Sequence, residues 1–177
     1  AVTRLQTDDA GITITAPTIA NMANCTFPVG HIIQTVVAIK HDEVSKDTTS
    51  DTFSKVVDAS DNAEWKATIS NLQTDSDVLI HCSFTGSNYR AGTSSAAGGF
   101  GLYRDDAILK EPAASNFYQS GSADQSYHVS LTYVDESPSS TSHTYFLGYK
   151  ANWSGITQVR SQSTHFPFTM ILQEIKR

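Results

Sequence analysis

The chain has few of the features that mark several protein classes. Its 177 residues include only two cysteines, Cys25 and Cys82, and five prolines. The cysteines form no CxxC pair and no metal-ligand spacing with histidine, so we expect two free, buried thiols or, alternatively, one disulfide. The longest apolar runs are about four residues, such as residues 36–39. A membrane-spanning helix needs about 20 apolar residues, so the sequence predicts no membrane insertion.

Charge is also sparse. Charged residues make up 17% of the chain, and 12 basic against 18 acidic residues give a net charge of −6. The basic residues are scattered along the sequence, which argues against a surface that neutralises nucleic-acid phosphates. We therefore expect no nucleic-acid partner.

Sequence motifs of catalysis are absent. The chain contains no GxSxG, HExxH, GxGxxG or P-loop motif, and its six histidines are dispersed. Asp58, Asp61 and Glu64 lie close together in sequence, and we interpret them as solvated turn residues. A calcium site or a glycosidase-type carboxylate pair is the alternative. We expect no catalytic residue, no metal site and no cofactor, and hence a protein that is not an enzyme.

Serine and threonine are abundant instead. They number 22 and 20, about 24% of the chain, beside seven tyrosines and eight phenylalanines. This composition favours pleated sheet and hydroxyl-rich turns. Apolar and polar residues alternate, as in strands with one buried face, over residues 65–70, 78–84, 99–104, 127–135, 144–151 and 168–176. With turn-rich stretches between them, these segments predict an all-β fold: an antiparallel β-sandwich that is jelly-roll-like.

The start of the chain differs from the rest. Residues 1–28 are interpreted as a short extended N-terminal arm, and residues 29–177 as the β-sandwich head domain. The arm is too apolar for a plain linker, because it contains Ile12, Ile14, Ile19 and Phe27. These side chains need a partner, either the head domain or the arms of other copies.

The first predicted strand of the head domain, residues 32–40, is apolar on both faces. Alternation places Ile33, Val37 and Ile39 on one face and Ile32, Val36 and Ala38 on the other. A strand of this kind is typical of one that is covered on both sides. We therefore expect more burial here than one face of a sandwich supplies.

Several aromatic residues fall in predicted loops or at strand ends. They stand beside arginine and asparagine, in the set Tyr89, Arg90, Asn116, Phe117, Tyr118 and Trp153. An aromatic ring can stack on the apolar face of a sugar, while asparagine and arginine bind its hydroxyl groups. These residues are candidates for ligand binding, and packing at the end of the sandwich or at a subunit contact is the alternative.

Six sequence blocks occur in an order that is more specific than the composition. They are FPVGHIIQTVVAIK at residues 27–40, DSDVLIHCSF at 75–84, GLYRDDAIL at 101–109, LTYVDESP at 131–138, SHTYFLGYK at 142–150 and MILQEIKR at 170–177. Together they resemble the C-terminal β-sandwich domain of phage virion fibre proteins, the tail fibres and head fibres of marine and cyanobacterial phages. The resemblance covers residues 27–177 and brings no catalytic motif with it.

This resemblance implies a homotrimer with the N-terminal segment along the threefold axis. Threefold assembly would cover the apolar arm and the two-faced strand. We expect the trimer interface to include Ile12, Ile14, Ile19, Phe27, Ile32 and Val36.

The function that the resemblance implies is a structural and adhesive module of a phage particle. It would be a fibre tip in the virion that binds host surface polysaccharide through several weak sites at once. One alternative is a capsid decoration (cement) protein that clamps capsomers, with other virion proteins as its partners. A polysaccharide-degrading enzyme is the other alternative.

Overall fold

The computed structural model describes residues 28–40, 44–57, 65–90, 96–111, 117–119, 125–136, 138, 141–153, 155–161 and 167–177. These residues form the strands β1 (Ile32–Lys40), β2 (Val44–Thr48), β3 (Ser54–Lys55), β4 (Lys66–Ser70), β5 (Ser76–Arg90), β6 (Ala96–Arg104), β7 (Ala107–Lys110), β8 (Phe117–Gln119), β9 (Gln125–Asp135), β10 (Ser142–Trp153), β11 (Gly155–Ser161) and β12 (Phe168–Lys176). Several predicted positions lie outside the described residues: Ile12, Ile14, Ile19, Cys25, Phe27 and Asn116. No helix among the described residues is long and apolar enough to cross a membrane.

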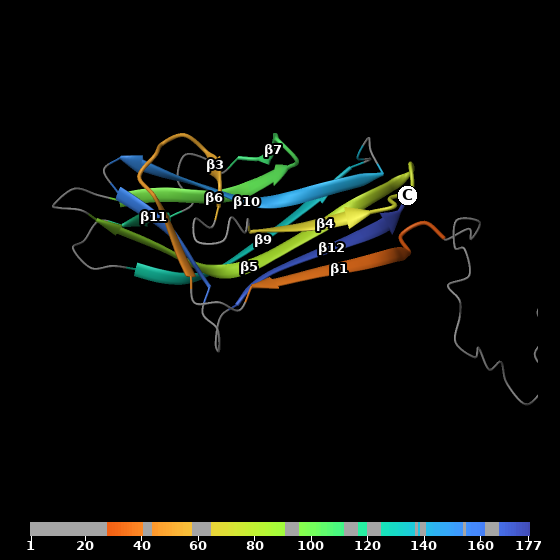
Figure 1. The fold of residues 1–177 in the computed structure, drawn as a ribbon, viewed down its shortest axis with the longest axis horizontal. Helices are drawn as coiled ribbons and strands as arrows, with labels where there is room; N and C mark the ends of the chain where they lie inside the picture. Colours follow the sequence, from red (N-terminus) through yellow and green to blue (C-terminus); the bar gives the residue numbers. More distant parts are fainter. Residues whose placement is uncertain are drawn as a thin grey trace, which may run out of the picture.

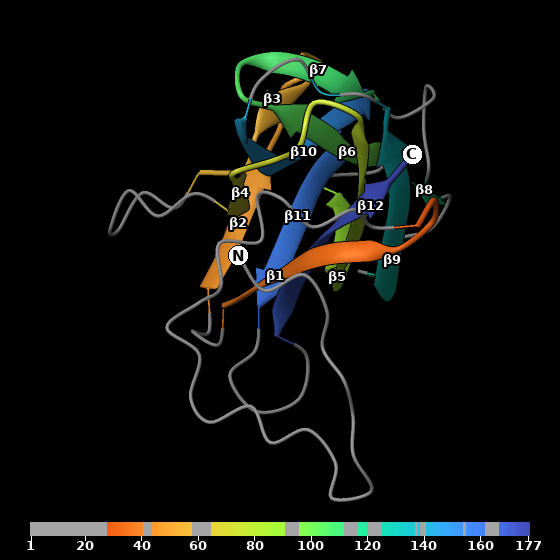
Figure 2. The same cartoon turned by 90° about the vertical axis from the view of Figure 1, so that its right-hand side faces the viewer.

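Two antiparallel sheets pack against each other. Among the described residues, each sheet has six strands. The larger sheet, which contains more residues, has the order β1-β12-β5-β11-β2, and β9 pairs with the other edge of β5. The smaller sheet has the order β3-β10-β6-β7, with β4 beside β10 and β8 beside β6. Figures 1 and 2 show β1, β5 and β12 in one layer and β6, β7 and β10 in the other. The predicted antiparallel β-sandwich is confirmed.

Consecutive short strands extend each other along the long ones. On one edge of β5, β12 pairs with residues 76–83 and β11 with residues 85–90. In the same way β1 and β2 form one line, as do β3 and β4 on β10, and β7 and β8 on β6. Counting each such pair as one strand leaves eight strands, which we number along the chain: β1 with β2, β3 with β4, β5, β6, β7 with β8, β9, β10, and β11 with β12. Their order is 1-8-3-6 in the larger sheet and 2-7-4-5 in the smaller one. This arrangement of two four-stranded sheets is a jelly roll.

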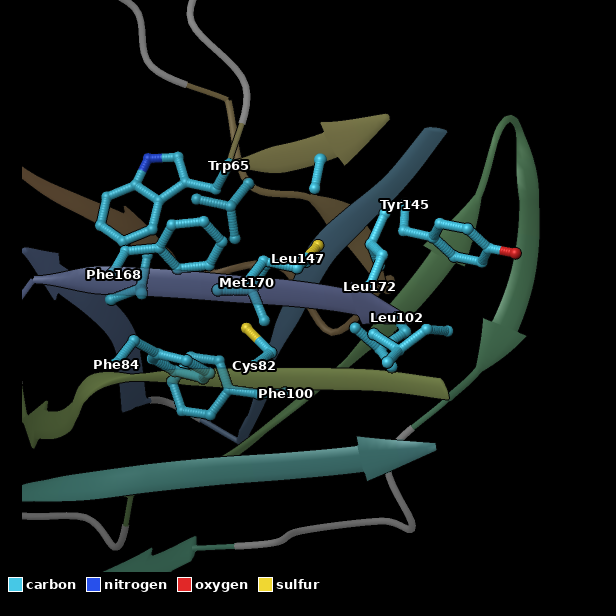
Figure 3. Close-up of a cluster of buried hydrophobic side chains, with 14 of the residues drawn as sticks. Trp65, Cys82, Phe84, Phe100, Leu102, Tyr145, Leu147, Phe168, Met170 and Leu172 are labelled. Atoms are coloured by element: carbon cyan, nitrogen blue, oxygen red, sulfur yellow. The ribbon is translucent and has the colours of Figure 1, made fainter. Parts of the chain in front are cut away.

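The core lies between the sheets and follows the alternation of the sequence. Val78, Ile80, Cys82 and Phe84 of β5 are all fully buried, as the period of two predicts. Figure 3 shows Phe168 of β12 beside Trp65, which precedes β4, and Phe84 of β5 beside Phe100 of β6, so aromatic rings of the two sheets meet in the core. The Trp65 and Phe168 rings meet edge to face at 5.1 Å, and those of Phe84 and Phe100 at 4.9 Å. Each such pair adds about 0.5–1.5 kcal/mol beyond its buried area.

Cys82 belongs to this core as a small apolar residue. Its thiol is free and fully buried, in agreement with the predicted free thiol at this position. Burial raises the pKa of the Cys82 thiol, since the thiolate would lose its hydration. The residue therefore contributes packing and has no reactive character.

A buried carboxylate fixes one end of the larger sheet. Glu174 of β12 is fully buried and accepts hydrogen bonds from Gln34 Nε2 at 2.7 Å and from the Gln73 N–H at 2.7 Å. The Ser76 hydroxyl donates a third, at 2.5 Å. Glu174 therefore joins β1, the turn before β5, and β12. The sequence pattern had placed this residue only in a closing strand.

Candidate functional site

The outer side of the larger sheet is unusual for a surface that faces solvent. We name it the open face and define it by twelve positions in register on four strands. They are Thr35, Val37 and Ile39 of β1; Thr169, Ile171 and Gln173 of β12; Leu79, His81 and Ser83 of β5; and Ser130, Thr132 and Val134 of β9. Strand pairing aligns them in three rows, with Val37, Ile171, His81 and Thr132 as the central row.

Large aliphatic side chains are exposed on the open face. The exposed fractions of Val37, Ile39 and Val134 are 52%, 50% and 43%. None of the twelve residues is Asp, Glu, Lys or Arg. Charged residues make up 17% of the chain, so about two would be expected at twelve positions. Five of the twelve residues are aliphatic and seven are neutral and polar, so the open face is a candidate interaction surface.

Three polar side chains of the open face form hydrogen bonds between β5 and β9. His81 Nδ1 lies 3.1 Å from Thr132 Oγ1, across the pair β5 and β9. Ser83 Oγ lies 3.1 Å from Nε2 of His128, which adjoins the open face on β9. These bonds leave fewer hydroxyl and imidazole groups in need of water, which lowers the cost of covering this surface.

The outer side of the smaller sheet differs, because lysines cover its apolar residues. Phe53, Tyr103 and Phe146 form a small aromatic cluster there. The Lys55 ammonium lies 4.0 Å from the centre of the Phe146 ring, and the Lys66 ammonium lies 5.6 Å from it. The lysine stems shield the rings while the charged ends stay in water. Among the described residues, lysines therefore cover this side, while Val37, Ile39 and Val134 of the open face stay exposed.

β1 supplies both covered and uncovered apolar residues. Val36 and Ala38 pack against the core of their own chain, while Val37 and Ile39 lie on the open face. Val36 is one of the residues predicted for the trimer interface, and the core of its own chain already covers part of its side chain. Ile32 is 47% exposed, and a register shift between Ile32 and Gln34 interrupts the alternation at this point.

A second candidate site lies at one end of the sandwich, where strand pairing brings together the backbone positions of five of the six predicted ligand residues. We name Tyr89, Arg90, Phe117, Tyr118 and Trp153 the strand-end cluster. Arg90 pairs with Gly155 and Tyr89 with Ile156, while Trp153 follows Asn152, the partner of Ala97. Ala97 and Gly98 of β6 also pair with Tyr118 and Phe117 of β8. These residues belong to both sheets and are separated by up to 64 positions (89 to 153) in the sequence.

The backbone around this cluster is more regular than the sequence suggested. Residues 86–98 are rich in glycine and serine, which favours a turn-rich stretch, but β5 continues to Arg90 and β6 begins at Ala96. Gly86 is compatible with a strand here because Phe100 and Val129 fill the space beside it. A Cβ atom at Gly86 would lie 2.8 Å from Phe100 Cε2. The glycine permits close packing between the sheets.

One histidine–carboxylate pair occurs at the turn between β6 and β7. His143 is buried, and its Nδ1 lies 2.6 Å from Asp105 Oδ2. The Thr144 N–H donates to Asp105 Oδ1 at 2.9 Å, and Asp105 has a positive φ of 52°. Partial burial acts to raise the pKa of Asp105, but the hydrogen bonds from Thr144 and His143, with the charges of His143 and Arg104, outweigh it and lower the pKa. The pair closes a turn, which favours a structural role.

The part of the chain that the structure describes contains no candidate metal site. No three His, Cys, Asp or Glu residues there are grouped so that they could hold a metal ion. The carboxylates Asp58, Asp61 and Glu64 lie outside the described residues.

The chain was also compared with known proteins. No family model matches it, and no curated protein matches it.

Proposed function

We propose that this chain is a structural and adhesive module of a phage particle, the distal part of a virion fibre. It associates as a homotrimer and binds polysaccharide on the host surface without cleaving it. The observation that carries the proposal is the strand-end cluster, in which strand pairing gathers aromatic residues and an arginine at one end of the sandwich. The blocks along residues 27–177 that resemble phage fibre domains support the same function.

The residue types of the cluster suit a sugar ligand. Tyrosine, phenylalanine and tryptophan offer flat apolar faces against which a sugar ring can stack. Arg90 adds a fork of hydrogen-bond donors for hydroxyl or carboxylate groups on an acidic polysaccharide. Because the five residues come from β5, β8 and β10, the site rests on both sheets of a rigid scaffold.

Assembly strengthens binding at such a site. A single shallow sugar site is weak, but three copies in one fibre bind a repeating polysaccharide at several points. Each further contact is then intramolecular, and the apparent affinity rises by about 10²–10⁴ without any new kind of contact.

Binding to an array of bacterial surface polysaccharides tests this function. We expect the wild-type protein to bind at least one polysaccharide class, and Trp153→Ala or Tyr118→Ala to reduce that binding about tenfold or more, since the loss recurs in every copy. Ile108→Ala is the control, because Ile108 is 51% exposed on β7 and lies outside the cluster.

Three results would contradict the proposal. If the array shows no binding and both cluster variants leave host attachment unchanged, the adhesive function fails. Binding to capsids in place of host polysaccharide would support the capsid decoration alternative. Shortened polysaccharide products after incubation would support the enzyme alternative.

A further inference from the structure

We infer that the open face is the surface through which copies of this chain meet. This inference rests on the homotrimer of the proposed function, because it names the surface that forms it. A monomer would leave Val37, Ile39 and Val134 in contact with water at about half of their full exposure. Burial against apolar side chains of another copy removes that contact and stabilises the assembly.

Charge favours a second copy over a charged partner as the occupant. Each copy carries a net charge of −6, so two copies repel unless they meet where no charge is concentrated. The twelve positions of the open face contain no charged residue, and a copy brings the same neutral surface. A basic or acidic partner would find no charge of opposite sign there. The outer side of the smaller sheet, in contrast, holds Lys55 and Lys66 over its aromatic cluster.

The open face is small for an interface between only two copies. Strands lie about 4.8 Å apart and same-face residues about 6.8 Å apart, so twelve positions cover about 400 Å². Two copies face to face would bury about 800 Å², which is typical of crystal contacts. A cyclic trimer buries the same area of each copy but holds each copy by two neighbours, so that a copy leaves only when both contacts break.

β1 and β9 have different parts in this arrangement. β1 brings Val37 and Ile39 to one side of the open face, and Val134 of β9 lies at the other. In a cyclic trimer, surfaces that meet need not be identical, so the β1 side of one copy can pack against the β9 side of the next. The hydrogen-bonded pair His81 and Thr132 then lies between these two apolar strips.

Light scattering after size exclusion, combined with one charged substitution, tests the inference. We expect the wild-type chain to have three times its mass of 19.2 kDa. Val37→Asp should give a folded chain of 19.2 kDa, because each copy would bring a carboxylate into the interface. The matched control is Ile108→Asp, since Ile108 and Val37 are 51% and 52% exposed and only Val37 is on the open face. Circular dichroism establishes that each variant is folded.

A milder variant covers the case in which Val37→Asp does not fold. The double variant Val37→Thr, Val134→Thr keeps both branched side chains and replaces one methyl group of each by a hydroxyl. We expect it to raise the concentration of half-dissociation about tenfold or more, with an unchanged circular dichroism spectrum.

The outcomes separate this inference from the proposed function. A wild-type chain of 19.2 kDa at high concentration, or folded open-face variants that assemble like the wild type, would overturn the inference. Loss of assembly in the open-face variants but not in Ile108→Asp supports it. A trimer that binds no polysaccharide would refute the adhesive function and leave the open face as the interface.

Discussion

Arg104 and Asp135 join the two sheets of the sandwich. Nη1 of Arg104 in β6 lies 2.8 Å and 3.0 Å from the two carboxylate oxygens of Asp135 in β9. The hydroxyl of Tyr145 in β10 donates to the same carboxylate at 2.7 Å. Figure 3 shows the Tyr145 ring directing its hydroxyl away from the aliphatic core. Asp135 follows Val134 directly, so this bond also holds one side of the open face in place.

Substitution of Asp135 by asparagine should destabilise the fold by about 2–4 kcal/mol. The partly buried Arg104 guanidinium would lose its negative partner, and one of the two oxygens that accept from Arg104 and Tyr145 would become an amide NH₂ group. Urea unfolding at pH 7 measures the change. Asp106→Asn is the control, because the Asp106 side chain is fully exposed at 102% and its bond to Lys55 is a surface ion pair. A loss in Asp135→Asn no larger than that of the control would show that the bond does not hold the sheets together.

Glu174→Gln should lower the melting temperature by about 5–10 °C. Each carboxylate oxygen of Glu174 accepts hydrogen bonds, and a glutamine amide would turn a donor toward Gln34 or toward Ser76 and the Gln73 N–H. A buried donor facing another donor costs about 1–3 kcal/mol.

Differential scanning calorimetry of Glu174→Gln beside Glu111→Gln checks this expectation. Glu111 bonds Lys150 at 2.8 Å, but its side chain is 49% exposed, so its substitution should change the melting temperature little. Equal melting temperatures for both variants would mean that Glu174 does not fix this end of the sheet.

Asp105→Asn should destabilise the protein at neutral pH but not in acid. The pKa of Asp105 in the folded protein is lowered, so its carboxylate contributes stability above its unfolded pKa of about 3.9. That contribution is lost as the pH falls through the lower pKa of the folded protein. Because Asp105 is half exposed, the difference at pH 7 should stay below about 1 kcal/mol.

Asparagine is the appropriate substitution because it tolerates the positive φ of 52° at this position. Unfolding free energies of both proteins between pH 7 and pH 2 give the comparison. Other carboxylates such as Asp75 titrate in both proteins and cancel in the difference. A gap that stays constant down to pH 2 would contradict a role for the charge of Asp105.

The thiol of Cys82 should react only after unfolding. It is fully buried in the core, and burial raises its pKa, so neither access nor thiolate is available in the folded protein. Labelling of a Cys25→Ser variant with a chromogenic disulfide measures Cys82 alone. We expect the labelling rate to follow the unfolded fraction as urea is added. Fast labelling without urea would mean that the core around Cys82 opens readily.

The sequence predicted the strands whose alternation is strong. Val78, Ile80, Cys82 and Phe84 were placed on one face and are all buried there, because each inward step is apolar and each outward step is polar or half exposed. The same reasoning did not find β2 or β11. Their residues are mostly polar or small, and they become strands by pairing with each other and with β5. Long-range pairing of this kind leaves no period in the local sequence.

The candidate surfaces were predictable only in part. The sequence showed that residues 32–40 are apolar on both sides, but not which side the chain would cover by itself. That choice depends on the packing of Val36 and Ala38 onto the core. The neutral rows of the open face also require strand register, since they combine residues from four strands. Five of the predicted ligand residues were separate positions until the pairing of β5 with β11, and of β8 and β10 with β6, brought them to one end.

The accessibility of position 134 in the assembled protein is the most direct test that copies meet at the open face. In a single copy Val134 and Ile108 are similarly exposed, at 43% and 51%. Cysteine placed at one or the other position, in a Cys25→Ser background, reports its accessibility through the rate of alkylation. If copies meet at the open face, cysteine at position 134 should react about tenfold or more slowly than cysteine at position 108. Equal rates at both positions in the assembled protein would contradict the account.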